Sequence, residues 1–295
     1  MADERPPYTV QEFTAGDGYR LKYRRYPAHD TPRGELVFIH GIQSHAGWYE
    51  HSCTRFAEAG YHVSFLDRRG AGMNAEARGD APGGFRRLLD DLAEFLTALP
   101  REVPRGATVG RLPLFLGAIS WGGKLAVALE RRHPGLVDGL MLFCPGFKAR
   151  VKPSLGQRVL IVLCRLFRPR KLFPIPLNDP ELFTANPRWH AFLREDPLRL
   201  HHATARLLVE SARLDGYLRF VPKYVHVPVL MLLAEHDRII HNRKTREFVE
   251  RFATPDKEII EYAGAHHTLE FEPEPERFIA DVLRWLEKNC QSRDR

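Results

Sequence analysis

The sequence predicts an α/β fold in which a mostly parallel sheet is covered by helices on both faces. Short apolar runs of strand length alternate with longer, helix-like segments along most of the chain. Several of these runs, such as Val229–Ala234, are continuously apolar, as expected for strands buried on both faces. The alternation stops near residue 147 and resumes near residue 225, which indicates a segment inserted into a single core.

The predicted elements follow one another in a regular order. The chain opens with a hairpin, because two strand-like runs flank the turn signal Gly16-Asp17-Gly18. The core strands are expected at 8–15, 19–26, 35–39, 61–66, 112–116, 138–143, 229–234 and 258–262. The core helices are expected at 51–59, 84–99, 242–252 and 274–289, with one more that ends at His133. This order divides the chain into a core, 1–146 and 225–295, and an inserted cap, 147–224.

The first part of the cap is basic and apolar. Residues 146–178 hold eight Lys and Arg side chains and no acid, and this segment accounts for the whole positive excess of +7. Its run Val159–Phe167 is apolar nearly all round, so two interpretations stay open. The helix either touches an anionic membrane through residues 148–171 or packs on the core with its arginines reaching outward. The second part is rich in aromatic residues and is expected to end in a helix over 211–220.

Composition limits the function classes. The four cysteines are widely spaced and are expected to be reduced thiols, so we expect neither a disulfide framework nor a metal site. Ala75 stands where a dinucleotide-binding fingerprint beginning at Gly70 needs its third glycine, so no nucleotide cofactor is expected. No nucleic-acid-binding module is evident. The N-terminus lacks a signal-peptide pattern and no apolar run is long enough to span a bilayer, so the expected compartment is the cytoplasm, with peripheral membrane contact as the open question above.

A candidate nucleophile lies between a strand and a helix. The pentapeptide Ala118-Ile119-Ser120-Trp121-Gly122 approximates the G-x-S-x-G turn that lifts a serine clear of a sheet. Alanine replaces the first glycine, a position that needs a small side chain more than a positive φ. The pentapeptide alone is equally compatible with an ordinary strand-to-helix turn.

Partners for that serine follow two later strands. Asp237 comes directly after the run Val229–Ala234, and His267 lies in the loop after the strand 258–262. A serine, a histidine base and an acid that orients the base form the triad used in acyl transfer. His266 is an alternative base and Glu235 an alternative acid. The position directly after the strand and the flanking Arg238-Ile239 favour Asp237, and the choice between the two histidines stays open at this point.

The loop after the strand 35–39 is the candidate oxyanion hole. It reads His40-Gly41-Ile42-Gln43, and we expect the glycine to let backbone amides turn toward a substrate carbonyl.

These motifs resemble the monoacylglycerol lipase, lysophospholipase and serine aminopeptidase branch of the α/β-hydrolases, over about residues 35 to 270. The resemblance implies an α/β-hydrolase fold, a Ser120–Asp237–His267 triad and oxyanion N–H groups from Ile42 and Trp121, supported by His40 and Gly41. It also implies a cofactor-independent serine hydrolase acting on carboxylic esters, with monoacylglycerols or lysophospholipids as the expected small-molecule substrates. The alternatives are an aminopeptidase or thioesterase with the same triad, and an idle relative that binds a hydrophobic ligand or a membrane.

Overall fold

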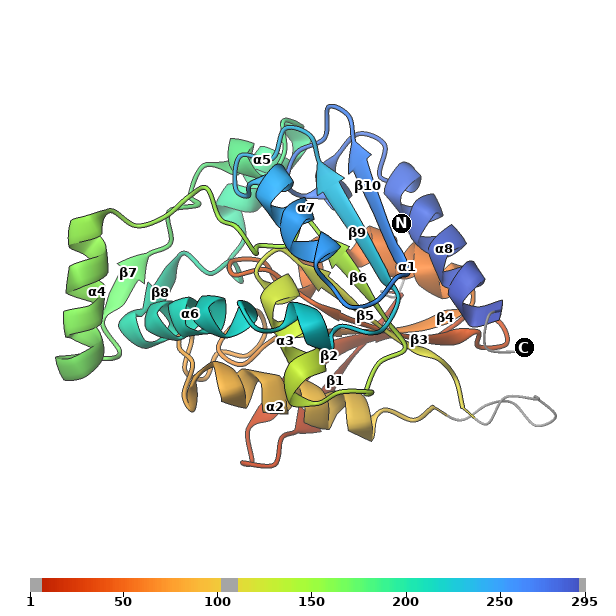
Figure 1. Cartoon of the computed structure of the whole chain (residues 1–295), viewed down its shortest axis with the longest axis horizontal. Helices are drawn as coiled ribbons and strands as arrows, with labels where there is room; N and C mark the ends of the chain where they lie inside the picture. Colours follow the sequence, from red (N-terminus) through yellow and green to blue (C-terminus); the bar gives the residue numbers. More distant parts are fainter. Residues whose placement is uncertain (1–6, 102–110, 292–295) are drawn as a thin grey trace, which may run out of the picture.

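The computed structural model describes residues 7–101 and 111–291 and contains an eight-stranded sheet with the order β1-β2-β4-β3-β5-β6-β9-β10 (Figure 1). β1 and β2 form the predicted hairpin, β2 pairs antiparallel with β4, and all remaining neighbours are parallel. The strands are β1 (Thr9–Thr14), β2 (Arg20–Tyr26), β3 (Gly34–Ile39), β4 (Tyr61–Leu66), β5 (Leu114–Ile119), β6 (Gly139–Phe143), β9 (Val229–Ala234) and β10 (Lys257–Tyr262). The predicted α/β class is confirmed.

Helices cover both faces of the sheet. α1 packs beside α8 and α2 beside α3, and Figure 1 shows the two pairs on opposite sides. Every residue of β3, β5, β6 and β9 is buried, which explains their continuously apolar sequences. The core helices are α1 (Glu50–Glu58), α2 (Gly84–Ala98), α3 (Gly122–Arg132), α7 (Asn242–Glu250) and α8 (Glu276–Gln291).

The segment between β6 and β9 carries the remaining elements. These are α4 (Leu155–Phe167), β7 (Leu172–Pro174), α5 (Arg188–Glu195), β8 (His202–Thr204) and α6 (Ala205–Leu218), with short 3-10 turns between them. α6 packs against α2, α3 and α4. α4 stands at the outer edge of the molecule beside α6 (Figure 1).

Several predicted boundaries were wrong, and two of them have a clear physical reason. β5 begins at Leu114 and not at residue 112, because Pro113 has no N–H to donate to a ladder. α6 begins at Ala205, six residues before the predicted start at 211, because the Thr204 side chain accepts a hydrogen bond from the Leu207 N–H and caps the helix there.

Most apolar side chains of α4 face solvent. Only Ile161 and Cys164 are buried, and both belong to a small cluster shared with α6. The exposed fractions of Val162, Leu166 and Phe167 are 54%, 70% and 81%. Within 7–101 and 111–291, no helix is long and apolar enough to cross a bilayer.

Candidate active site

Ser120 sits at a strained turn directly after β5. Its φ is 51°, a left-handed conformation that costs a non-glycine residue about 1–3 kcal/mol. The turn is held because the Ser120 carbonyl accepts hydrogen bonds from the N–H groups of Gly123, at 3.0 Å, and Gly146, at 2.7 Å. Gly122 is required for space, since a Cβ there would lie 2.7 Å from the His40 carbonyl oxygen. Ala118 lies within β5 and not at the strained position, so alanine is tolerated there.

The structure brings Ser120, His267 and Asp237 into one hydrogen-bonded row. His267 Nε2 is 2.9 Å from Ser120 Oγ, and His267 Nδ1 is 2.6 Å from Asp237 Oδ2. The second carboxylate oxygen of Asp237 accepts hydrogen bonds from the N–H groups of Ile239 and Ile240. His267 and Asp237 are both buried, so the carboxylate is fixed by three donors away from water. This arrangement can take a proton from Ser120 and hold the imidazole in the tautomer that accepts it.

The two alternative residues lie elsewhere. The backbone N–H of His266 donates to Glu272, and its ring packs against His236. Glu235 accepts a hydrogen bond from the Gly264 N–H at the surface. The geometry therefore favours His267 and Asp237 over their neighbours.

The loop after β3 passes close to Ser120. In the described part of the chain, the N–H groups of Ile42 and Trp121 donate to no other protein group, so both are free to meet a substrate oxygen. Gly41 does not have a positive φ, so it does not use the left-handed conformation that glycine favours. It supplies room instead, because a Cβ there would lie 3.3 Å from Ser120 Cβ.

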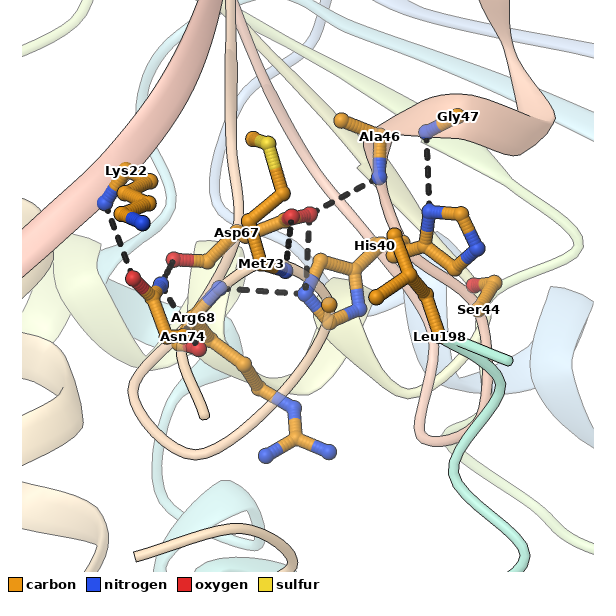
Figure 2. Close-up of polar contacts among 12 residues, drawn as sticks. Lys22, His40, Ser44, Ala46, Gly47, Asp67, Arg68, Met73, Asn74 and Leu198 are labelled. Atoms are coloured by element: carbon orange, nitrogen blue, oxygen red, sulfur yellow. Dashed lines mark hydrogen bonds and ion pairs between the residues drawn. The ribbon is translucent and has the colours of Figure 1, made fainter. Parts of the chain in front are cut away.

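A buried polar network supports this loop from below (Figure 2). His40 Nε2 accepts a hydrogen bond from the Arg68 N–H at 3.0 Å, so Nδ1 carries the proton that it donates to the Gly41 carbonyl at 2.8 Å. Burial lowers the pKa of His40 well below its ordinary value, which keeps this ring neutral. The carboxylate of Asp67 accepts from the N–H groups of Ala46 and Met73. The predicted supporting residues His40 and Gly41 are thus parts of a fixed scaffold.

Arg68 lies beside both candidate oxyanion residues, a position that was not predicted from the sequence. Its guanidinium donates to the Ile42 carbonyl at 2.8 Å and lies 5.3 Å from the centre of the Trp121 ring. Burial lowers the pKa of Arg68 to about 10, so the group stays cationic at neutral pH. Its position after β4, at the same sheet edge as Ser120, was the available signal.

The cap is fastened to the same loop. Asp196, before β8, accepts hydrogen bonds from His45 at 2.8 Å and from the Trp48 indole N–H at 2.6 Å. The buried Arg199 donates to the Gln43 side chain. The hydroxyl of Ser211 on α6 accepts a hydrogen bond from the Trp121 indole N–H at 2.8 Å. The cap and the candidate oxyanion loop are therefore held in one arrangement.

Cys144 is a further side chain at the centre of the site. Its sulfur, one Asp237 oxygen and one His267 nitrogen lie within 4.8 Å of one another, a grouping that could be considered for a metal. Burial raises the pKa of the Cys144 thiol well above its ordinary value, and Asp237 adds to the shift. A thiol that keeps its proton donates to Asp237 and is a poor metal ligand. These residues fit a support for the acid better than a metal site.

Comparison with known proteins agrees with this geometry. The family model for serine aminopeptidase S33 matches residues 30–274. The chain belongs to the serine aminopeptidase S33 family. This membership confirms the α/β-hydrolase resemblance and makes the protein a hydrolase of that fold.

Several proteins that are similar to this chain are lipases of acylglycerols. The chain is 30% identical to a monoacylglycerol lipase of Mycolicibacterium smegmatis, over 93% of this chain and 95% of that protein. It is 26% identical to human monoglyceride lipase, over 90% of this chain and 85% of that protein. In fold it is similar to the Saccharomyces cerevisiae monoglyceride lipase, with a TM-score of 0.81, 20% identity and 98% of each chain covered.

Proposed function

We propose that this protein hydrolyses carboxylic esters of acylated lipids, such as monoacylglycerols or lysophospholipids, through an acyl-enzyme on Ser120. The observation that carries the proposal is the position of His267, whose two ring nitrogens lie 2.9 Å from Ser120 Oγ and 2.6 Å from Asp237 Oδ2. A base held this way by a buried carboxylate matches the demands of serine-mediated acyl transfer.

The first half of the reaction forms the acyl-enzyme. Ser120 Oγ attacks the ester carbonyl carbon while its proton passes to His267 Nε2, and the carbonyl oxygen becomes an oxyanion. The free N–H groups of Ile42 and Trp121 stabilise that oxyanion, and one such donor contributes about 3 kcal/mol in comparable sites. The ester C–O bond then breaks, and the departing alkoxide takes the proton from His267 and leaves as an alcohol.

Water completes the cycle. It gives one proton to His267 and attacks the acyl carbon, and the second tetrahedral intermediate releases the Ser120 oxygen, which recovers its proton from the imidazole. The products are a carboxylic acid and free enzyme. Asp237 remains ionised throughout and stabilises the imidazolium that forms twice in each turnover.

Two features support a lipid ester over other acyl substrates. The relatives at 30% and 26% identity are monoacylglycerol and monoglyceride lipases. The aromatic ring of Phe183 from the cap packs edge-on against His267, which places an apolar wall beside the base.

An aminopeptidase would need cap acids that are free to bind a substrate amine, and three acids of the cap have other partners. Asp196 is occupied by His45 and Trp48. Asp179 accepts from the Glu181 N–H, and Glu181 itself lies 3.8 Å from Arg238. These three acids therefore have partners of their own, which favours an ester substrate over a peptide with a free N-terminus.

We further propose that α4 contacts a membrane surface. Its residues Val159, Val162 and Leu166 follow an i, i+3, i+7 spacing and form one exposed stripe. Exposed apolar stripes bordered by cations are typical of helices that lie in a bilayer interface. The two interpretations of the sequence combine here, because one face of α4 packs on α6 while the other is free.

A substrate profile tests the proposed activity. Hydrolysis of p-nitrophenyl esters from acetyl to palmitoyl, a monoacylglycerol, a lysophosphatidylcholine, an acyl thioester and an aminoacyl anilide is measured for wild type, Ser120→Ala and His267→Ala. We expect serine-dependent turnover that rises with acyl length, and we expect His266→Ala, the matched neighbour, to keep it. Turnover of the anilide alone would overturn the lipid assignment, and turnover that survives Ser120→Ala would overturn the mechanism.

Vesicle co-sedimentation tests the membrane contact. The double variant Val162→Ser and Leu166→Ser should lose vesicle binding, and Val10→Ser, an equally exposed valine on β1, should retain it. Equal binding by all three proteins would contradict the role of α4.

A further inference from the structure

A wide groove lies between α4, α6 and the beginning of α2, away from Ser120. Its volume is about 910 Å³. Figure 1 shows α6 between α4 and the core, with the first turn of α2 below it. The charged lining residues are Arg86, Arg131, Arg165, Arg206, Arg213 and Glu210. We call this surface the arginine groove.

The arginine groove carries a strong positive charge. Glu210 is its one acidic lining residue among those described, and it already accepts from the Arg213 guanidinium at 2.7 Å and from the Phe85 N–H at 3.3 Å. A second hollow of about 580 Å³ shares Pro169 and Arg206 with it. The other residues of that hollow are Arg168, Arg170 and Lys171. The two hollows together form a continuous cationic surface.

Several of these cations have no anionic partner. In 7–101 and 111–291, Arg86, Arg165 and Arg170 form no ion pair. The Nε atom of Arg165 is buried without any hydrogen-bond partner. A buried N–H that donates to nothing is unfavourable, because it has given up its hydrogen bonds to water without replacement. The groove thus lacks an acceptor that a ligand could supply.

We propose that the arginine groove binds the phosphate group of a membrane phospholipid. Guanidinium groups present planar pairs of donors that match phosphate oxygens. The inference rests on the proposed membrane contact of α4 and extends it to a defined headgroup site. Four of the groove's arginines lie outside the basic cap segment 148–171: Arg86 on α2, Arg131 on α3, and Arg206 and Arg213 on α6.

The position of Arg165 favours a lipid over a soluble phosphate. Arg165 lies on α4 directly after the buried Cys164 and one residue before the exposed Leu166, so it borders both the inward face and the apolar stripe. When that stripe enters the acyl region of a bilayer, the arginine groove meets the layer of phosphates. The exposed Phe220 at the rim adds an aromatic ring, which is favoured at headgroup depth.

The test uses binding to vesicles of phosphatidylcholine with and without phosphatidylglycerol. The triple variant Arg86→Gln, Arg165→Gln and Arg170→Gln removes cations that hold no ion pair. The matched control, Arg243→Gln, Arg251→Gln and Arg277→Gln, removes the same charge at α7 and α8. Each arginine beside an anionic surface contributes roughly fivefold to binding, so the groove variant should lose about a hundredfold in affinity for phosphatidylglycerol vesicles. The control should lose less than about threefold, because none of its arginines lines either hollow.

Other outcomes overturn the proposal. Equal losses in the two triple variants would make the effect one of net charge alone. Thermal stabilisation of the wild type by inorganic phosphate, with no preference for phosphatidylglycerol, would assign the groove to a soluble phosphate. Selective loss of oligonucleotide binding in the groove variant, with vesicle binding intact, would assign it to nucleic acid.

Two readouts distinguish a failure of the phosphate site from a failure of the proposed esterase activity or of the proposed membrane contact of α4. Turnover of p-nitrophenyl acetate should be equal in all these proteins, since no substituted residue lies at the triad, and this also shows that they fold. The α4 variant Val162→Ser and Leu166→Ser should lose binding to both kinds of vesicle. If that variant binds normally and the groove variant does not, the phosphate site stands without the insertion of α4.

Discussion

Glu270 is a buried carboxyl group that should make the protein less stable as the pH rises. It lies three residues after His267, and its Oε1 accepts a hydrogen bond from the Ser52 N–H at 3.0 Å. Its Oε2 is buried with no hydrogen-bond partner. Burial raises the pKa of Glu270 from 4.5 to about 7. The perturbation is Glu270→Gln, which keeps the acceptor and removes the charge.

The sign follows from proton binding in the two states. Between pH 4.5 and 7 the folded protein holds the Glu270 proton and the unfolded chain releases it, so the free energy of unfolding falls through this interval. The stability associated with the neutral group is fully present below pH 4.5 and is lost by about pH 7. The shift of the Glu270 pKa from 4.5 to about 7 corresponds to about 3 kcal/mol in the free energy of unfolding.

Chemical denaturation at pH 4.5, 6 and 8 measures this effect. Glu270→Gln should match wild type at pH 4.5 and exceed its free energy of unfolding by about 3 kcal/mol at pH 8. Glu274→Gln, a change at an exposed glutamate nearby, should follow wild type at every pH. A Glu270→Gln protein that is less stable than wild type at pH 8 would refute the reasoning, and so would a constant difference between the two across the pH range.

Three further predictions concern the site. Asp237→Asn should lower kcat for a short ester about ten thousandfold because it favours the wrong tautomer of His267, and a loss below tenfold would argue against this acid. The free energy of unfolding of Ser120→Gly should exceed that of Ser120→Ala by about 1 kcal/mol, because glycine adopts the φ of 51° without strain. Equal melting temperatures of the two variants would mean that the turn stores no strain. Arg68→Gln frees the Ile42 carbonyl and should lower kcat roughly ten- to a hundredfold with KM little changed, and a change confined to KM would assign Arg68 to substrate binding instead.

Much of the site could be predicted because parallel strands end at one edge of the sheet. Ser120, Asp237 and the loop starting at His40 each follow a buried strand, and apolar runs mark those strands clearly. His267 follows β10 in the same way. The order of these residues along the chain was therefore enough to bring them together.

The supports of the site could not be predicted from local pattern. Arg68 reaches Ile42 across 26 positions, and Asp196 reaches His45 across 151. Such contacts depend on how loops of the core and the cap fold against one another, which no periodicity encodes. Cys144 directly follows β6 at the same edge as Ser120, so its position alone could have marked it.

The buried face of α4 could not be predicted from the sequence either. A helix with apolar residues nearly all round can pack on a neighbour with any face. Only the placement of α6 determines that Ile161 and Cys164 point inward and that Val162 and Leu166 stay outside.

Covalent labelling tests whether Ser120 is the nucleophile and His267 its base. Wild-type protein is treated with a fluorophosphonate and its intact mass and modified peptide are determined. We expect one adduct, on Ser120, that disappears in Ser120→Ala. It should form far more slowly in His267→Ala than in His266→Ala. A folded wild-type protein that gains no adduct, or an adduct on another residue, would contradict this assignment.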